Sequence, residues 1–228
     1  MLGEVFRIDN ILNTCEKILY FFKVNLLFLL CNLPMVLFLL FVGAGQVRAY
    51  LPLFLLCMVP FGPALSAVFF AMNRLLHKYD TTAWHDYWQG YIDAWGQKMM
   101  VSAIHMLLIW MFWTNIEFFS IQMPILPLLI VFVVLFVAVI LATPNLYLLT
   151  ARYRMPLADI WKGALMLTIT RPLLTLSNCV IFAFALMLLE VRAGTMILFL
   201  ASIYGFLTVF LNQQVFKQLD KMATNRES

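Results

Sequence analysis

Six long intervals without a charged residue constrain the fold of this chain more than any other feature. Each holds between 18 and 34 uncharged residues, bounded by Lys23 and Arg48, Arg48 and Arg74, Lys98 and Glu117, Glu117 and Arg152, Arg171 and Glu190, and Arg192 and Lys217. A helix needs about 20 residues to cross the hydrocarbon core of a bilayer. The sequence therefore predicts six membrane-spanning helices, at residues 24–43, 51–73, 99–117, 125–149, 173–190 and 194–214.

The composition agrees with this class of protein. Of the 228 residues, 64% are hydrophobic and only 11% are charged, whereas soluble domains carry about 25% charged residues. No segment outside the apolar intervals is long enough to bury a second, water-soluble core. We expect an all-α polytopic helix bundle that forms one integral membrane domain over residues 1–228, with a polar tail at 215–228.

The positive charges predict how the chain is oriented. With a cytoplasmic N-terminus, thirteen Lys and Arg residues fall on the inner side, and only Arg48 and Arg192 fall on the outer side. Cytoplasmic loops carry such an excess of Lys and Arg. Both termini are therefore expected in the cytoplasm, in a multi-pass protein of the cell membrane. The same asymmetry explains the formal net charge of +4 without a nucleic-acid partner.

Three amphipathic helices are expected on the cytoplasmic side, at residues 1–22, 82–97 and 156–170. The second belongs to the stretch 61–98, around which we expect the chain to be organised. Its apolar residues recur at helical spacing on one face, with Asp86 and Asp93 on the other: they are Trp84, Tyr87, Trp88, Tyr91, Ile92 and Trp95. Aromatic residues of this kind favour the lipid headgroup layer.

Prolines and small polar residues inside the predicted spans are the candidates for a substrate site. Pro60 and Pro63 lie near the middle of the second span, so the carbonyls of Leu56 and Val59 would lose their usual helical partners. One interpretation is a broken helix at a binding site, and the other, which we favour, is a packed kink. The candidate residues are Asn25, Asn32, Pro34, Pro63, Ser66 and Asn145. Such polar groups often join helices to one another.

No motif in the sequence indicates catalysis, a metal or a cofactor. The four cysteines lack metal-ligand spacing, and the chain has no P-loop, HExxH, GxSxG or paired carboxylates. His105 is the one imidazole inside a span, and we interpret it as a buried, hydrogen-bonded side chain rather than a proton relay. We therefore expect that the protein is not an enzyme.

The cytoplasmic ends of the spans and the surface helices provide candidates for contact with a partner. Cations close the two inward-going spans, at Arg74 and at Arg152 and Arg154, where they suit helix C-termini and lipid phosphates. The full set of candidate docking or interface residues is Arg74, Trp84, Asp86, Trp88, Asp93, Trp95, Arg152, Arg154, Trp161, Lys162 and Arg171.

Two segments carry a resemblance to a known family. The stretch GPALSAVFFAMNRL with its following Trp-rich helix, and the stretch LYLLTARYRMPLADIWKGALMLTITRPLLTL, resemble the YesL family of bacterial membrane proteins. The likeness runs from the N-terminal helix, with Asn25, to the sixth span. Members of that family have no known function and are commonly encoded beside sugar importers and polysaccharide-degrading enzymes. The resemblance implies an accessory role in carbohydrate uptake and supplies no catalytic residues.

Two function classes follow from these observations. The first is an accessory or regulatory subunit that docks on a sugar-importer membrane complex through its cytoplasmic helices. The alternative is a small passive permease or channel that uses the broken helices. An intramembrane enzyme is a weaker third alternative.

Overall fold

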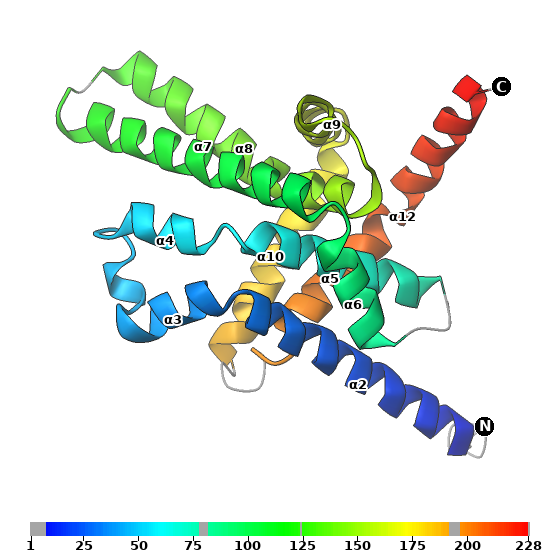
Figure 1. Ribbon diagram of the computed structural model, residues 1–228. Coiled ribbons are helices and arrows are strands. Elements are labelled where there is room, and N and C mark those ends of the chain that lie inside the picture. Colours follow the sequence, from blue (N-terminus) through cyan, green and yellow to red (C-terminus); the bar gives the residue numbers. More distant parts are fainter. Residues whose placement is uncertain (1–7, 78–81, 124, 192–196, 228) are drawn as a thin grey trace.

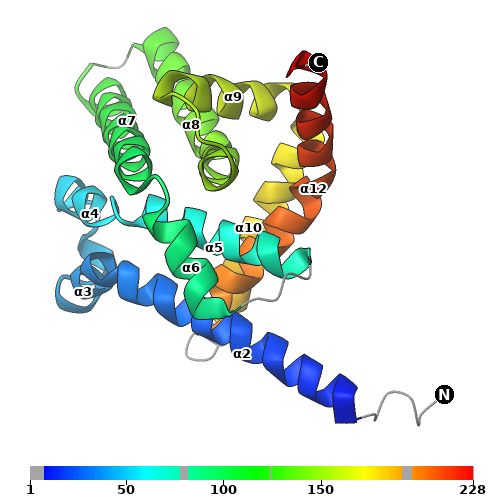
Figure 2. The same cartoon turned by 45° about the vertical axis from the view of Figure 1, so that its right-hand side comes forward.

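The computed structural model describes residues 8–77, 82–123, 125–191 and 197–227, and all regular secondary structure in these ranges is helical. The predicted all-α fold class is confirmed. In Figure 1, helices α7 (Trp95–Ile121) and α8 (Leu126–Arg152) form a hairpin that projects to one side. Figures 1 and 2 both show the first half of α2 (Ile8–Cys31) and the end of α12 (Leu200–Glu227) extending beyond the other helices.

Three segments in the described residues are long and apolar enough to cross a membrane. They are Leu51–Leu76, which joins α4 (Leu51–Cys57) to α5 (Phe61–Leu76), and the two helices of the α7–α8 hairpin. They correspond to the second, third and fourth predicted spans. An α-helix of 27 residues, the length of α7, is about 40 Å long.

The other predicted spans are bent or short, so the predicted number of six is not confirmed. Helix α2 meets α3 (Leu33–Phe41) at 70°, and α9 (Leu157–Thr170) meets α10 (Pro172–Val191) at 95°. The apolar part of α12, Leu200–Gln213, is shorter than a full span. The described residues thus give three spans, or up to five if each bent pair counts as one. Residues 1–7 of the predicted N-terminal helix and 194–196 of the sixth span lie outside the described ranges.

Prolines stand at several of these breaks because proline lacks a backbone N–H and fits the first turn of a helix. Pro34 lies in the first turn of α3, Pro52 in that of α4, and Pro172 is the first residue of α10. Pro144 is an exception, since α8 continues through it. A proline in the sequence therefore indicates a position where a helix can start, but a helix does not start at every proline.

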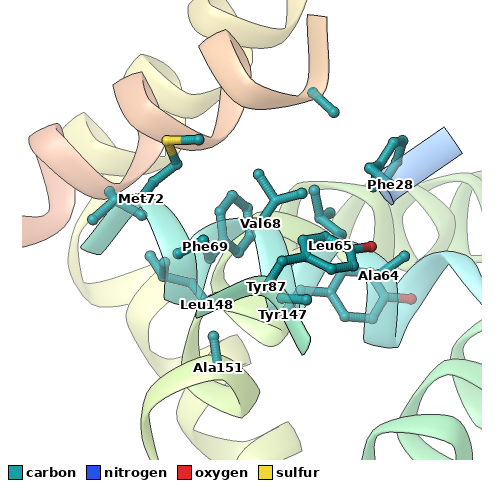
Figure 3. Packing of buried hydrophobic residues seen from close by; sticks show 14 of the residues in the cluster. Phe28, Ala64, Leu65, Val68, Phe69, Met72, Tyr87, Tyr147, Leu148 and Ala151 are labelled. Atoms are coloured by element: carbon teal, nitrogen blue, oxygen red, sulfur yellow. The ribbon is translucent and has the colours of Figure 1, made fainter. Parts of the chain in front are cut away.

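Helix α5 is the centre of the molecule. Every residue from Gly62 to Phe69 is buried, as are Ala71 and Met72. Figure 3 shows side chains of α5 in contact with Tyr87 of α6 (Ala83–Ile92) and with Tyr147 and Leu148 of α8. The stretch 61–98 does organise the chain, because its first helix packs against α2, α6, α7, α8 and α12.

Glycines permit two of the closest helix approaches. A Cβ atom at Gly62 would lie 2.6 Å from the Ser102 side chain of α7 and 2.7 Å from the Tyr147 ring of α8. A Cβ atom at Gly205 of α12 would lie 2.5 Å from Val68 Cγ1. All three distances are far below van der Waals contact, so α5 can reach its neighbours only because these positions lack a side chain.

The outer half of the α7–α8 hairpin contrasts with this centre. Only 11% of the most apolar 18-residue stretch of α8 is buried inside the protein. Large aliphatic side chains such as Leu128, Val134 and Val137 are exposed. In a bilayer these side chains would face lipid, which is as apolar as they are.

Candidate functional site

Charged and polar side chains gather at one end of the bundle, which we call the basic end and define by Arg74, Asp86, Asp93, Lys98 and Arg154. At the opposite end, Arg48 of the α3–α4 connection and Glu117 of α7 form an ion pair at 2.7 Å. Arg74, Lys98 and Arg154 belong to the cations predicted on the inner side of the membrane, and Arg48 is one of the two predicted on the outer side.

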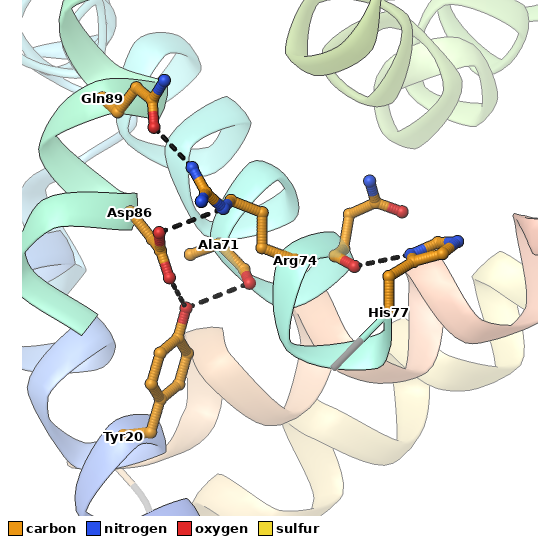
Figure 4. Close-up of polar contacts among 7 residues, drawn as sticks. Tyr20, Ala71, Arg74, His77, Asp86 and Gln89 are labelled. Atoms are coloured by element: carbon orange, nitrogen blue, oxygen red, sulfur yellow. Dashed lines mark hydrogen bonds and ion pairs between the residues drawn. The ribbon is translucent and has the colours of Figure 1, made fainter. Parts of the chain in front are cut away.

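An ionic cluster at the basic end holds α6 against α5 and α2 (Figure 4). Arg74 Nε lies 3.1 Å from Asp86 Oδ1, and Arg74 Nη1 donates to Gln89 Oε1 at 2.6 Å. The Tyr20 hydroxyl lies 2.9 Å from Asp86 Oδ2 and 3.1 Å from the Ala71 carbonyl oxygen. The Asp86 side chain is 1% exposed and that of Arg74 is 26% exposed. A carboxylate buried this deeply is stable only because a cation and a hydroxyl donor face it.

The burial of Asp86 corrects the prediction that it lies on the exposed polar face of the surface helix. The buried side of α6 consists of Ala83, Asp86, Tyr87 and Gly90. Burial raises the pKa of Tyr87 well above its ordinary value, so this phenol stays neutral. The helix is therefore rotated relative to the expected orientation, and Asp86 stabilises the fold instead of offering a charge to a partner.

Trp84 and Trp88 of α6, and Trp95 at the start of α7, all keep some solvent-accessible surface. Trp84 is 63% exposed and Trp95 is also exposed, whereas Trp88 is half-buried. The rings of Trp84 and Trp88 meet edge to face, with centroids 5.9 Å apart. This aromatic surface has the composition expected of a lipid-headgroup contact or a protein contact.

The predicted single helix at 82–97 is wrong in one respect, because it breaks at Asp93 and Ala94. Ala94 takes a left-handed backbone conformation, with φ 50 and ψ 36, and α7 starts at the next residue. The break lets Lys98 Nζ donate to the Gly90 carbonyl oxygen at 2.6 Å. It also places Asp93 beside the segment that follows α8.

Two contacts join this break to the α8–α9 connection. Arg154 forms an ion pair with Asp93, and Gln97 Nε2 donates to the Met155 carbonyl oxygen. The Arg154 side chain is 76% exposed and that of Asp93 is 31% exposed. Unlike the Arg74–Asp86 pair, the Arg154–Asp93 pair keeps much of its charged surface accessible to water or to a partner.

Helix α9 presents the remaining docking candidates. It packs on α8 through the buried residues Ile160 and Ala164. Lys162 and Arg171 are exposed, and Trp161 is half-buried with its ring centroid 5.6 Å from that of His105. His105 itself is buried, and its Nε2 lies 3.1 Å from Thr143 Oγ1, as expected for a hydrogen-bonded histidine.

The amides of Asn25 and Asn32 both donate to backbone carbonyls of the protein, and Asn32 Oδ1 is buried without a hydrogen-bond partner among the described residues. Asn25 donates to the Ile197 carbonyl oxygen at 2.8 Å and accepts from the Ala201 amide at 2.9 Å, which ties α2 to the start of α12. Asn32 donates to the Phe28 carbonyl oxygen at 2.8 Å, one turn earlier in the chain.

Ser66 and Asn145 also join helices. Ser66 Oγ lies 2.8 Å from Thr150 Oγ1 of α8. Asn145 donates to Thr168 Oγ1 at 3.0 Å and belongs to a chain of amides that continues through Asn178 of α10 to Asn212 of α12. These contacts agree with the interpretation of the polar residues as links between helices.

The two proline candidates do not meet in one site. Pro34 is exposed at the α2–α3 bend, and Pro63 is buried in the first turn of α5, where a missing N–H costs no helical hydrogen bond. The Leu56 carbonyl oxygen, expected to lack a partner, accepts from the Val59 amide at 3.2 Å. The break in the second predicted span is therefore a closed turn at 58–60.

Sequence reasoning missed Tyr20, Gln89 and Asn73. Tyr20 is 66 residues from Asp86, and no local pattern pairs them. Asn73 lines a small cavity with Arg152, which is half-buried rather than exposed. The Asn73-Arg74 pair at the end of the second predicted span is a recognisable polar site in the sequence. That it lies beside Arg152 of α8 could be found only from the fold.

Residues 21–116 match the model of a family described as a protein of unknown function, DUF624. The matched residues, under half of the chain, run from α2 through most of α7. They include Arg74, Asp86 and Gln89 of the ionic cluster and begin one residue after Tyr20. No curated protein and no solved structure matches the chain.

Proposed function

We propose that this chain is an accessory membrane subunit that docks on a carbohydrate-import complex through its basic end, which faces the cytoplasm. The observation that carries the proposal is the division of its polar groups. The polar candidates inside the bundle hydrogen-bond to groups of the same chain, whereas charged and aromatic side chains are exposed at the basic end.

The basic end is also held rigidly enough to present a defined surface. The Tyr20–Arg74–Asp86–Gln89 cluster fixes α6, and the Asp93–Arg154 pair fixes the connection that leads into α9. Exposed side chains on α6, at the start of α7 and on the segment that follows α8 include Trp84, Trp95, Arg154, Lys162 and Arg171. Aromatic residues and arginine are enriched at protein interfaces.

The carbohydrate part of the proposal rests on the resemblance to the YesL family, whose members are expected beside sugar importers. The matched description, a protein of unknown function, assigns no activity of its own. Orientation with the basic end in the cytoplasm rests on the thirteen against two distribution of positive charges.

The test is co-purification from native membranes in mild detergent, followed by mass spectrometry. Arg154→Glu with Lys162→Glu should reduce capture of importer components about tenfold or more, because rim and partly buried charges guide such contacts. A control at the opposite end, Arg48→Glu with Glu117→Arg, reverses an exposed ion pair without changing the net charge and should leave capture unchanged.

A charge swap separates docking from simple stability. Arg154→Asp with Asp93→Arg preserves the ion pair but reverses its polarity, so a purely structural pair would be rescued and a docking surface would stay defective. Saturable uptake of labelled oligosaccharide into proteoliposomes that contain this protein alone, abolished by Asn145→Ala, would overturn the proposal in favour of a passive permease.

A further inference from the structure

A small cavity lies between α5, α8 and α12 at the basic end. Its volume is about 90 Å³, well above the roughly 10–15 Å³ that one water needs, so it can hold a group of several heavy atoms. Part of its wall is formed by Phe69, Leu148, Ala151 and Val209, which are all buried. Figure 3 shows Phe69 of α5 close to Leu148 and Ala151 of α8.

The rest of the wall is different in character. Phe70, Asn73 and Arg152 line the cavity and are only half-buried. The cavity is therefore apolar at its buried part and carries a cation and an amide at its accessible part. An amphiphile with an anionic head and an apolar chain has this same distribution of polarity.

The polar side of the cavity suits a phosphate group. Arg152 carries five N–H donors in a planar fork, which matches phosphate oxygens while leaving donors for other contacts, and the Asn73 amide adds two more. The guanidinium carbon of Arg152 lies 5.9 Å from the centroid of the Tyr153 ring. The carboxylates of Asp86 and Asp93 at this end pair with Arg74 and Arg154, respectively.

The position of the cavity along the helices suits a lipid source for the phosphate. Asn73 lies one turn before the end of α5, and Arg152 is the last residue of α8. Both helices belong to segments apolar enough to span a membrane. Their basic ends therefore lie near the level at which a bilayer presents its phosphates.

We propose that this cavity is a binding site for the phosphate of an anionic lipid, held by Arg152 and Asn73, with the start of an acyl chain or the glycerol backbone against Phe69 and Val209. The site is separate from the exposed docking surface of Arg154 and Lys162. It does not depend on the identity of any protein partner.

The test uses the full chain, purified and stripped of lipid in a non-ionic detergent. Native mass spectrometry and tryptophan fluorescence follow titration with dioctanoyl phosphatidylglycerol, dioctanoyl phosphatidylcholine and inorganic phosphate. We expect phosphatidylglycerol to bind more tightly than phosphatidylcholine and far more tightly than inorganic phosphate. Arg152→Gln should weaken phosphatidylglycerol binding about tenfold or more, since hydrogen bonds to a charged group are lost.

Arg154→Gln is the matched control, because it removes the same charge two residues further along but outside the cavity. It should change the affinity by less than about twofold, in line with a screened surface charge. Ala151→Leu keeps every charge and fills the cavity, so it should weaken binding as much as Arg152→Gln. If Arg152→Gln does not fold, Ala151→Leu compared with Arg154→Gln still separates binding in the cavity from diffuse attraction to the basic end.

Three results would overturn the proposal. Equal losses for Arg152→Gln and Arg154→Gln would show diffuse attraction to the basic end, and full binding by Ala151→Leu would show that the cavity is not used. Inorganic phosphate that binds as tightly as phosphatidylglycerol would replace the lipid by free phosphate.

Discussion

At the scale of single residues, two ion pairs of the same chemistry lie in different surroundings. Arg74–Asp86 joins α5 to α6 at the basic end, and its carboxylate is 1% exposed. Arg48–Glu117 joins two segments at the opposite end, with side chains 69% and 42% exposed. Removing one partner of a buried pair leaves an uncompensated buried charge, whereas exposed pairs contribute little.

Asp86→Asn should therefore lower the free energy of unfolding in detergent by about 3 kcal/mol. Glu117→Gln, which makes the same chemical change in the exposed pair, should lower it by less than about 1 kcal/mol. Chemical unfolding followed by tryptophan fluorescence measures both. Equal effects of the two substitutions would contradict the structural role of the buried cluster.

Asp86 also marks how far a local pattern reaches. Its place among the polar residues of the helical repeat predicted exposure, because an isolated carboxylate avoids an apolar core. The cation that neutralises it, Arg74, comes from α5, and the hydroxyl that donates to it, from Tyr20 of α2, is 66 residues away in the sequence. Asn25, Ser66 and Asn145, named from the sequence as substrate-site candidates, join helices in the structure, and their partners depend on the fold rather than on the local sequence.

At the scale of elements, the α6–α7 junction is the feature that the helical period could not predict. The spacing of aromatic residues continues from Trp84 to Trp95, yet the helix breaks at Ala94 in a left-handed conformation. A residue with a Cβ atom is strained there by roughly 1–2 kcal/mol. The break is stabilised by contacts with the α8–α9 connection, from Arg154 and Met155, which the local sequence does not contain.

Ala94→Gly should raise the thermal midpoint of the detergent-solubilised protein, because glycine adopts this conformation without strain. Ala103→Gly is the matched control, at an exposed position in the middle of α7. It should destabilise the helix by about 1 kcal/mol and so lower the midpoint. Circular dichroism during heating compares the two. A lower midpoint for both variants would contradict the conformation described for Ala94.

At the scale of the whole molecule, the bundle has two chemically distinct ends joined by long apolar helices. Charge-free intervals predicted where those helices lie, and three of the six predicted spans are long and apolar enough in the described residues to cross a membrane. The 70° and 95° bends could not be predicted in the same way, because an interval records the number of uncharged residues and not their direction. Pro34 and Pro172, in the first turns of α3 and α10, mark where the two helices restart after the breaks at Asn32 and Arg171.

The two ends should lie on opposite sides of the membrane. In a variant without Cys15, Cys31, Cys57 and Cys179, Gly45→Cys should react with an impermeant thiol reagent added to intact cells. Lys162→Cys, exposed at the basic end, should react only after permeabilisation. Reaction of Lys162→Cys in intact cells would reverse the proposed orientation.

The central claim, that the basic end docks on a partner within the membrane, is tested most directly by site-specific photo-crosslinking in native membranes. A photoreactive amino acid at Lys162 should yield adducts with an importer-class membrane protein, identified by mass spectrometry, whereas the same group at Gly45 should not. Adducts from Gly45 alone, or only lipid adducts from both positions, would contradict docking through the basic end.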